Sequence, residues 1–146
     1  MNCGRHTKEK QKMLTSTAKL FVGITLAVAS GGAAAAWTGL HEDSSDYQAF
    51  VEPASVKSNG VMVSLSMLYS MLEPDTNPSG IKYSSFVVQK EFDCSKNQKR
   101  NLSFAFYASK NGQGTPVDTK GPPPQWEVIA ADSPFAPELK YACGRK

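Results

Sequence analysis

The 146-residue chain is poor in the side chains that catalysis and metal binding use most often, with three cysteines and two histidines. Beyond residue 36 only two cysteines and one histidine, His41, remain. A structural zinc site takes about four ligands in closely spaced pairs, and no such spacing occurs. A hydrolase of the Ser-His-Asp type would depend on His41, yet no serine lies in a G-x-S-x-G context. We therefore expect neither an enzyme nor a bound metal or other cofactor.

Two further motifs, one acidic and one containing glycine, are incomplete. The segment with Glu42, Asp43 and Asp46 lacks the spaced carboxylates and the glycine of a calcium loop. The pair Gly112 and Gly114 follows a strand pattern, but no helix pattern comes after it to direct amides at a phosphate. We interpret the acidic segment as part of a flexible linker over residues 37–46, and the glycine pair as a hairpin turn.

Residues 1–36 have the three parts of a secretory signal peptide. A basic stretch precedes an apolar run over residues 20–29, and an A-x-A ending follows at residues 34–36. We expect cleavage before Trp37, and translation from Met13 would give a leader of more usual length. The apolar run is short and rich in Gly and Ala for a membrane span, with an uncleaved anchor as the alternative. With this signal peptide we expect an exported protein of the periplasm or cell surface. No lipobox cysteine follows the apolar run, and no stable membrane span is expected after cleavage.

The charge of the chain is unevenly distributed. The formal net charge is +3, but the leader carries five basic side chains against one acidic side chain, a net +4. Residues 37–146 therefore carry about −1. Because the basic character belongs to the leader, it gives no argument for nucleic acid as a partner. We place a single domain at residues 47–146, a length sufficient for one hydrophobic core.

Cleavage would remove Cys3 and leave Cys94 and Cys143, an even number in an oxidising compartment. A disulfide between these two cysteines is the default expectation, with two reduced buried thiols or half of a metal site as alternatives. Closing the intervening segment would stabilise the domain by roughly 4 kcal/mol on the chain-entropy estimate. That is a large share of the total of about 5–15 kcal/mol that is usual for a domain.

Alternating apolar and polar residues predict three long strands. They span residues 61–70, 82–94 and about 100–109. Polar turns connect them, which indicates an antiparallel meander without crossover helices. Between the first two, residues 73–80 contain two prolines and are expected to be a loop that no strand continues through.

Two short strands complete the expected sheet. Residues 47–51 would form a hairpin with the first long strand through the turn at residues 58–60, and residues 115–119 would follow the third. In that third strand, Leu102, Phe104 and Phe106 are expected to share the apolar face. The predicted fold class is α+β, mainly β, with a sheet of about five or six strands.

The C-terminal part changes character. Residues 121–124, a glycine and three prolines, form a stiff connector without donors for a ladder. Ser133 followed by proline fits an N-cap and predicts a helix that ends at Cys143, before Gly144. Because so short a helix is marginal alone, bonding of Cys143 to Cys94 would dock it on one face of the sheet.

Three cations, Lys96, Lys99 and Arg100, lie at the turn between the second and third long strands. A cationic tip of this kind would suit a sulfated glycan or an acidic protein surface. The alternative is that an exposed turn is simply basic.

An ordered series of short motifs extends over most of the chain beyond the leader. They are Ser55-Val56, Tyr83-Ser84-Ser85, Glu91-Phe92-Asp93-Cys94, Arg100 with Leu102, Tyr107, Gly112 with Gly114, Trp126 with Ile129, Asp132-Ser133 and Cys143. In this order and spacing the chain resembles the surface-adhesin protein E family of bacterial envelope proteins. The resemblance implies an antiparallel sheet with a C-terminal helix clamped to it by the Cys94–Cys143 bridge. It also implies binding to host extracellular-matrix or serum proteins.

Two functions are therefore compared. The first is an exported, adhesin-like binding module for a host protein or glycan. The second is a periplasmic, non-catalytic protein that is structural or holds a small apolar ligand. A polar sheet face bearing Ser64, Ser66, Ser103 and Tyr107 would favour the first, and a hydrophobic groove beside the helix would favour the second.

Overall fold

The computed structural model describes residues 35–40 and 44–144. The expected signal peptide falls, apart from its last two residues, outside these ranges, and so does His41. No helix in the described part of the chain is long and apolar enough to span a bilayer.

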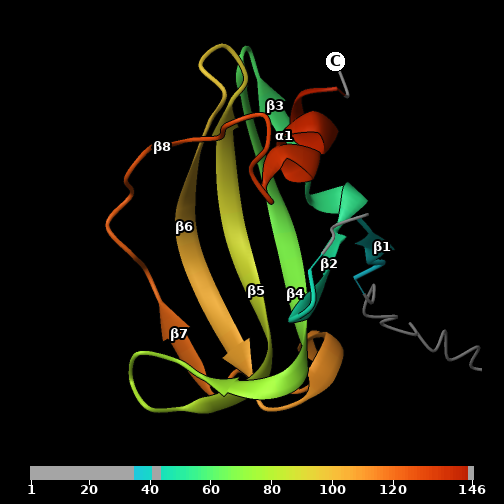
Figure 1. Ribbon diagram of the computed structural model, residues 1–146, viewed down its shortest axis with the longest axis vertical. Coiled ribbons are helices and arrows are strands. Elements are labelled where there is room, and N and C mark those ends of the chain that lie inside the picture. The colour runs from blue at the N-terminus through green and yellow to red at the C-terminus, as the bar shows by residue number, and fades with distance from the viewer. Residues whose placement is uncertain (1–34, 41–43, 145–146) are drawn as a thin grey trace, which may run out of the picture. The chain divides into compact units, whose positions relative to one another are not determined.

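The described residues form one antiparallel sheet with the strand order β1-β2-β4-β5-β6-β7 (Figure 1). Two short strands lie off this path, β3 against β4 and β8 against β6. The bounds are β1 Thr38–Gly39, β2 Tyr47–Val51, β3 Lys57–Asn59, β4 Met62–Thr76, β5 Lys82–Asp93, β6 Gln98–Tyr107, β7 Asp118–Lys120 and β8 Glu127–Val128. The antiparallel meander and the mainly β class predicted from the sequence are thus confirmed.

The first turns of the sheet differ from the expectation in two ways. Thr38 and Gly39, inside the segment expected to be a linker, pair as β1 with Val51 and Phe50 of β2. The turn at residues 58–60 does form a hairpin with β4, but its other strand is β3. The strand β2 pairs further along the same edge of β4, after the 3₁₀ turn Pro53–Ser55.

Period-two alternation gives the sheet one face that is buried, here called the helix face because α1 (Ala136–Cys143) lies on it. On β4 this face carries Val63, Leu65 and Met67, each at most 1% exposed. The register continues the face onto β5, where Val88 pairs with Met67. Full burial of such side chains stabilises a fold by roughly 1.5–3 kcal/mol each.

Two irregularities in the ladder change the faces that the sequence predicts. The register of β4 against β5 moves from Ser70↔Ser85 to Asp75↔Tyr83, so three extra residues bulge out of β4. Pro74 lies in this bulge, where its missing N–H costs no ladder bond, and the expected loop is wrong because β4 continues to Thr76. A hydrogen bond of 2.9 Å from the Tyr83 hydroxyl to Asp75 Oδ2 fixes the far side of the bulge.

The second irregularity is a bulge in β6 at Leu102. Gln89 pairs with Ser103 and Lys90 with Asn101, so Leu102 has no partner on β5. The alternation therefore shifts by one residue, and Asn101 shares the helix face with Phe104. Leu102 was expected to share that face and is instead left 38% exposed.

The helix α1 begins two residues later than the Ser133 cap predicts. Ser133 instead closes a turn, in which its carbonyl accepts a hydrogen bond from the Ala136 N–H. A helix capped by Ser133 would need the N–H of residue 137 for its first intrahelical bond, and Pro137 has none. Starting at Ala136 places Pro137 in the first turn, and Leu139 makes the first bond, to Phe135 O. The end at Cys143 agrees with the prediction.

A disulfide joins Cys94, directly after β5, to Cys143, the last residue of α1. The Cα atoms are 5.6 Å apart. Leu139 and Ala142 of the helix pack against the core of the sheet. The covalent clamp is therefore confirmed, and the two alternatives, free thiols and half of a metal site, are excluded.

We predict that replacing both bridge cysteines (C94S/C143S) destabilises the domain by about 4 kcal/mol, since a segment of 49 residues is no longer closed in the unfolded state. Urea unfolding of oxidised protein measures the difference. Wild-type protein unfolded under reducing conditions is the matched control and should reproduce it; equal midpoints for all three samples would contradict the prediction.

We predict that one tyrosine ionises far above the usual range. Burial first, and the Asp75 carboxylate next, raise the pKa of Tyr83 from 10.0 to about 12. A raised pKa means that the folded state favours the protonated phenol, so this stabilisation is complete below pH 10 and is lost between pH 10 and about 12. Tyrosinate absorbance should show a step near pH 12 that disappears in Tyr83→Phe and persists in Tyr107→Phe. A wild-type titration without the late step would refute the assignment.

Candidate functional site

Three polar side chains meet in the core beneath α1. Lys90 of β5, Tyr69 of β4 and Glu138 of α1 are each at most 4% exposed. The Lys90 ammonium lies 2.6 Å from Glu138 Oε2 and also donates to the Tyr69 hydroxyl, which in turn donates to Glu138 Oε1. The three groups close a ring of charge-assisted hydrogen bonds. We call them the buried triad.

The sequence analysis did not identify the buried triad, although a signal exists. Lys90 is in phase with Val88 and Phe92, positions that the alternation assigns to the apolar face. Glu138 is one helical turn before the buried Ala142. A lysine and a glutamate, each out of place on a buried face, are candidates for pairing because a buried charge needs a partner.

Beyond α1, aromatic rings continue along the helix face from β2 to β6. Tyr69 stacks on Phe86 with ring centroids 4.8 Å apart, and Phe86 lies 6.1 Å from Phe104. The whole set, here called the aromatic row, is Tyr47, Tyr69, Tyr83, Phe86, Phe104 and Phe106. Phe86 and Phe104 remain half-buried, since α1 covers only one end of the face (Figure 1). Rings that are packed on one side and exposed on the other are able to contact a partner.

A cavity of about 190 Å³ lies between Phe135, next to α1, and the aromatic row. Four rings of the row and the ring of Phe135 form most of its wall. Lys90, Lys99 and Asn101 contribute its polar groups. This is one groove beside the helix of the kind that the second hypothesis requires; a larger one, of about 960 Å³, is lined by Leu40, Pro53 and Tyr141.

The three cations expected at one tip occupy three different environments. Lys96 is at the turn, with a side chain 68% exposed, and its nearest carboxylate oxygen is Asp93 Oδ2 at 3.9 Å. The Ser95 hydroxyl donates to Asp93, which holds the pKa of that carboxyl below its ordinary value. Lys96 is therefore the exposed member of the set.

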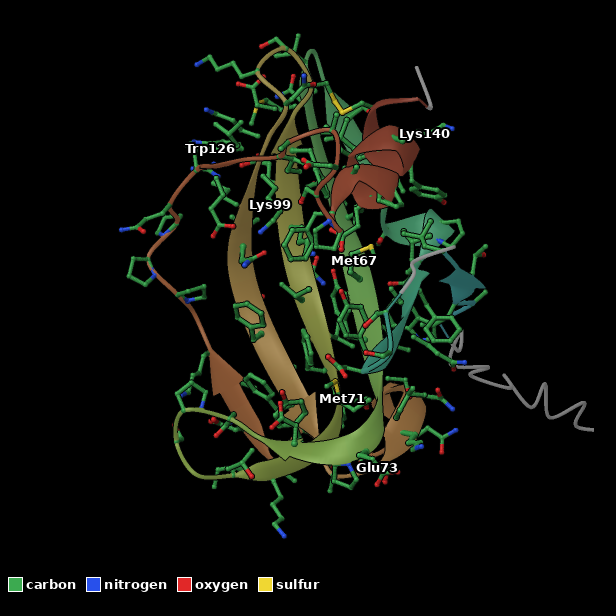
Figure 2. All side chains as sticks on the ribbon, viewed as in Figure 1. Met67, Met71, Glu73, Lys99, Trp126 and Lys140 are labelled. Atoms are coloured by element: carbon green, nitrogen blue, oxygen red, sulfur yellow. A yellow bond between two sulfur atoms is a disulfide. The ribbon has the colours of Figure 1, made fainter. Side chains whose placement is uncertain are left out.

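Lys99 and Arg100 are neighbours in β6 and consequently point to opposite faces. Lys99 is on the helix face, 4% exposed, 2.6 Å from Glu127 Oε2 and 4.3 Å from the ring centroid of Phe135 (Figure 2). Arg100 pairs with Glu91 on the outward face and stacks 4.6 Å from the Trp126 ring. The fold thus separates the three cations instead of gathering them into one exposed patch.

Part of the outward face of the sheet is polar, as the first hypothesis requires, whereas Leu68 and Val87 on the same face lie against Gly112. The register aligns Ser66, Gln89 and Ser103 in one row, and Gln89 Nε2 donates to Ser66 Oγ at 2.8 Å. Ser64 and Tyr107 lie on the same face. The two structural features that separate the hypotheses are therefore both present.

Neither face shows an arrangement for metal chemistry. In residues 35–40 and 44–144, no three His, Cys, Asp or Glu side chains are placed to hold a metal ion. The described surface presents aromatic rings on one face and hydroxyl and amide groups on the other.

Comparison with known proteins gives one sequence family and one fold. The family described as surface-adhesin protein E matches residues 37–144. No curated protein matches the chain. A structure of Haemophilus influenzae protein E is similar over 74% of this chain and 93% of its own, with a TM-score of 0.53 and 13% identity. The crystal structure of protein E from non-typeable H. influenzae gives 0.52 and 13%, over 75% of this chain and 84% of its own. At such identities the structural likeness concerns the fold.

We predict strong coupling within the buried triad. Lys90→Met leaves the Glu138 carboxylate buried without its cation and should lower the free energy of unfolding by about 3–5 kcal/mol. The double variant K90M/E138L removes both charges and should lose much less than the sum of the two single variants. Urea unfolding measures the cycle, and Lys96→Met, on an exposed lysine, should stay within about 0.5 kcal/mol of wild type. Additive losses would show that the pair is not coupled.

Proposed function

The chain belongs to the surface-adhesin protein E family, and from this membership we propose that it is an exported envelope protein that adheres to a host extracellular-matrix or serum protein. The family match over residues 37–144 is the observation that carries the proposal. A disulfide in the domain suits an oxidising compartment outside the cytosol. The proposal includes no catalytic activity.

The aromatic row is the contact surface that we assign to the partner. Centres of protein interfaces are enriched in aromatic residues and depleted of charge. Phe104 and Phe106 also line a second hollow, of about 460 Å³, with Pro78 and Pro122. This apolar stretch extends the row to the end of the sheet opposite α1.

A protein partner is better supported than a sulfated glycan. Binding a polyanion requires several free cations on one surface. Of the three candidates, Lys99 and Arg100 are each paired with a glutamate, and Lys96 alone is largely exposed. A Lys96→Glu change therefore offers a direct test of any remaining electrostatic contribution, without disturbing the core.

A periplasmic small-ligand protein is the second candidate. The cavity of about 190 Å³ beside α1 is the observation that favours it. The two candidates differ in whether the chain is accessible from outside the cell.

We predict that Phe104→Ser weakens binding to an immobilised host protein at least tenfold, because it removes a half-buried ring that lines both hollows of this surface. Binding of the exported chain to a panel of extracellular-matrix and serum proteins is measured by surface plasmon resonance. Ser103→Ala is the matched control, since it changes the neighbouring residue on the opposite face and should leave binding intact. Equal binding by wild type and Phe104→Ser would remove the row from the interface.

Protease treatment of intact cells separates the two candidates. An adhesin should be cleaved by external protease, whereas a periplasmic protein stays intact and is released with the periplasmic contents. Survival of the chain together with a periplasmic marker would end the adhesin proposal.

A further inference from the structure

One of the residues lining the cavity beside α1, Asn101, has a buried side-chain oxygen that the protein leaves unpaired. Across the residues that the structure describes, Asn101 Oδ1 is the buried side-chain oxygen or nitrogen without a hydrogen-bond partner. Leaving a buried acceptor unpaired destabilises a protein, and native structures contain few such atoms. An acceptor kept in this state beside a cavity is a reason to look for a donor that enters from outside.

The position of Asn101 follows from the β6 bulge. Asn101 pairs with Lys90 of β5, and the unpaired Leu102 brings Asn101 onto the same face as Phe104. Both Asn101 and Phe104 line the cavity. The terminal torsion of asparagine is soft, so its oxygen can turn toward a donor in the cavity without a change of backbone.

The charges around the cavity are already compensated. Lys90 is paired with Glu138, and Lys99 with Glu127, each at 2.6 Å. Both ammonium groups also lie over the ring of Phe135, at 5.0 Å and 4.3 Å from its centroid. An anionic ligand would have to compete with two carboxylates, so the site favours a neutral molecule.

The shape of the cavity favours one ring. Five aromatic rings form most of its wall, and rings prefer to pack against other rings. Its volume of about 190 Å³ exceeds the roughly 150 Å³ of an engineered apolar cavity that binds benzene. One six-membered ring with a small substituent therefore fits.

We propose that this cavity binds a single neutral aromatic ring that carries a hydrogen-bond donor, of which a phenol is the simplest, with the donor directed at Asn101 Oδ1. The ring belongs either to a free small molecule or to a tyrosine side chain on a partner protein. The proposal rests on the second candidate function, since it gives the cavity a ligand. It does not require that the chain be an adhesin.

Titration of the exported chain with p-cresol, followed by the backbone amide signals of the cavity-lining residues of β5 and β6 in NMR spectra, tests the proposal in wild type and variants alike. We expect saturable shifts, and binding about tenfold tighter than that of 4-methylanisole, the methyl ether that has no donor. Asn101→Leu should abolish this preference, while Ser103→Leu, on the outward face of the same strand, should retain it.

N-acetyltyrosinamide distinguishes the two sources of the ring. Binding of both p-cresol and N-acetyltyrosinamide supports a tyrosine presented by a partner, and binding of p-cresol alone supports a small free ligand. Absence of saturable shifts with p-cresol, or equal affinities for p-cresol and its methyl ether in wild type, would overturn the proposal. The comparison of the two probes needs no variant, and it is independent of cell fractionation and of binding to host proteins.

Discussion

The position of α1 on the sheet determines which part of the helix face is covered. A helix of 8 residues has little stability of its own in water. Two attachments hold it, the bond between Cys94 and Cys143 at its end and the contact of Glu138 with Lys90 and Tyr69 in its first half. The covalent link limits how far the helix can move, whereas the buried charges permit one position, because any shift leaves an unpaired ion in the core. With the helix fixed at one end, the other end of the helix face remains uncovered.

That division explains why one small sheet offers two kinds of surface. On the helix face, rings from four strands form a row in which Tyr69, Tyr83 and Phe106 are buried and Phe86 and Phe104 are half-buried. On the outward face, serine and glutamine side chains bond to one another across the strands. Because successive side chains of β4, β5 and β6 point to opposite faces, the same three strands supply both surfaces. The proposed contact surface and the core therefore share the same strands, so substitutions in the aromatic row need controls on the opposite face.

Much of this architecture follows from the sequence. The alternation at Val63, Leu65 and Met67 predicts β4 and its buried face, and an even cysteine count predicts the bridge. The failures have local physical causes. A bulge accommodates Pro74 inside β4, and the missing N–H of Pro137 moves the start of α1. The positions of the two prolines in the sequence do not reveal either adjustment.

The candidate site was harder to predict because it depends on partners far apart in the chain. The sequence predicts Lys99 at an exposed tip, whereas β6 directs it to the helix face toward Glu127 and directs its neighbour Arg100 outward toward Glu91. Lys90 and Glu138 are 48 residues apart, with all of β6, β7 and β8 between them, so no local motif joins them. Asn101 reaches the helix face only through the shift at Leu102, a feature of pairing between strands.

The connection between β7 and β8 passes beside β6 without pairing along its middle (Figure 1). Strand edges left open in this way are templates for association with other chains, which leads to aggregation. Here the bulge at Leu102 interrupts the regular spacing of donors and acceptors, and the three successive prolines at 122–124 offer no N–H to a neighbouring strand. The folded sheet therefore resists edge-to-edge association along β6 without adding any charge to the surface.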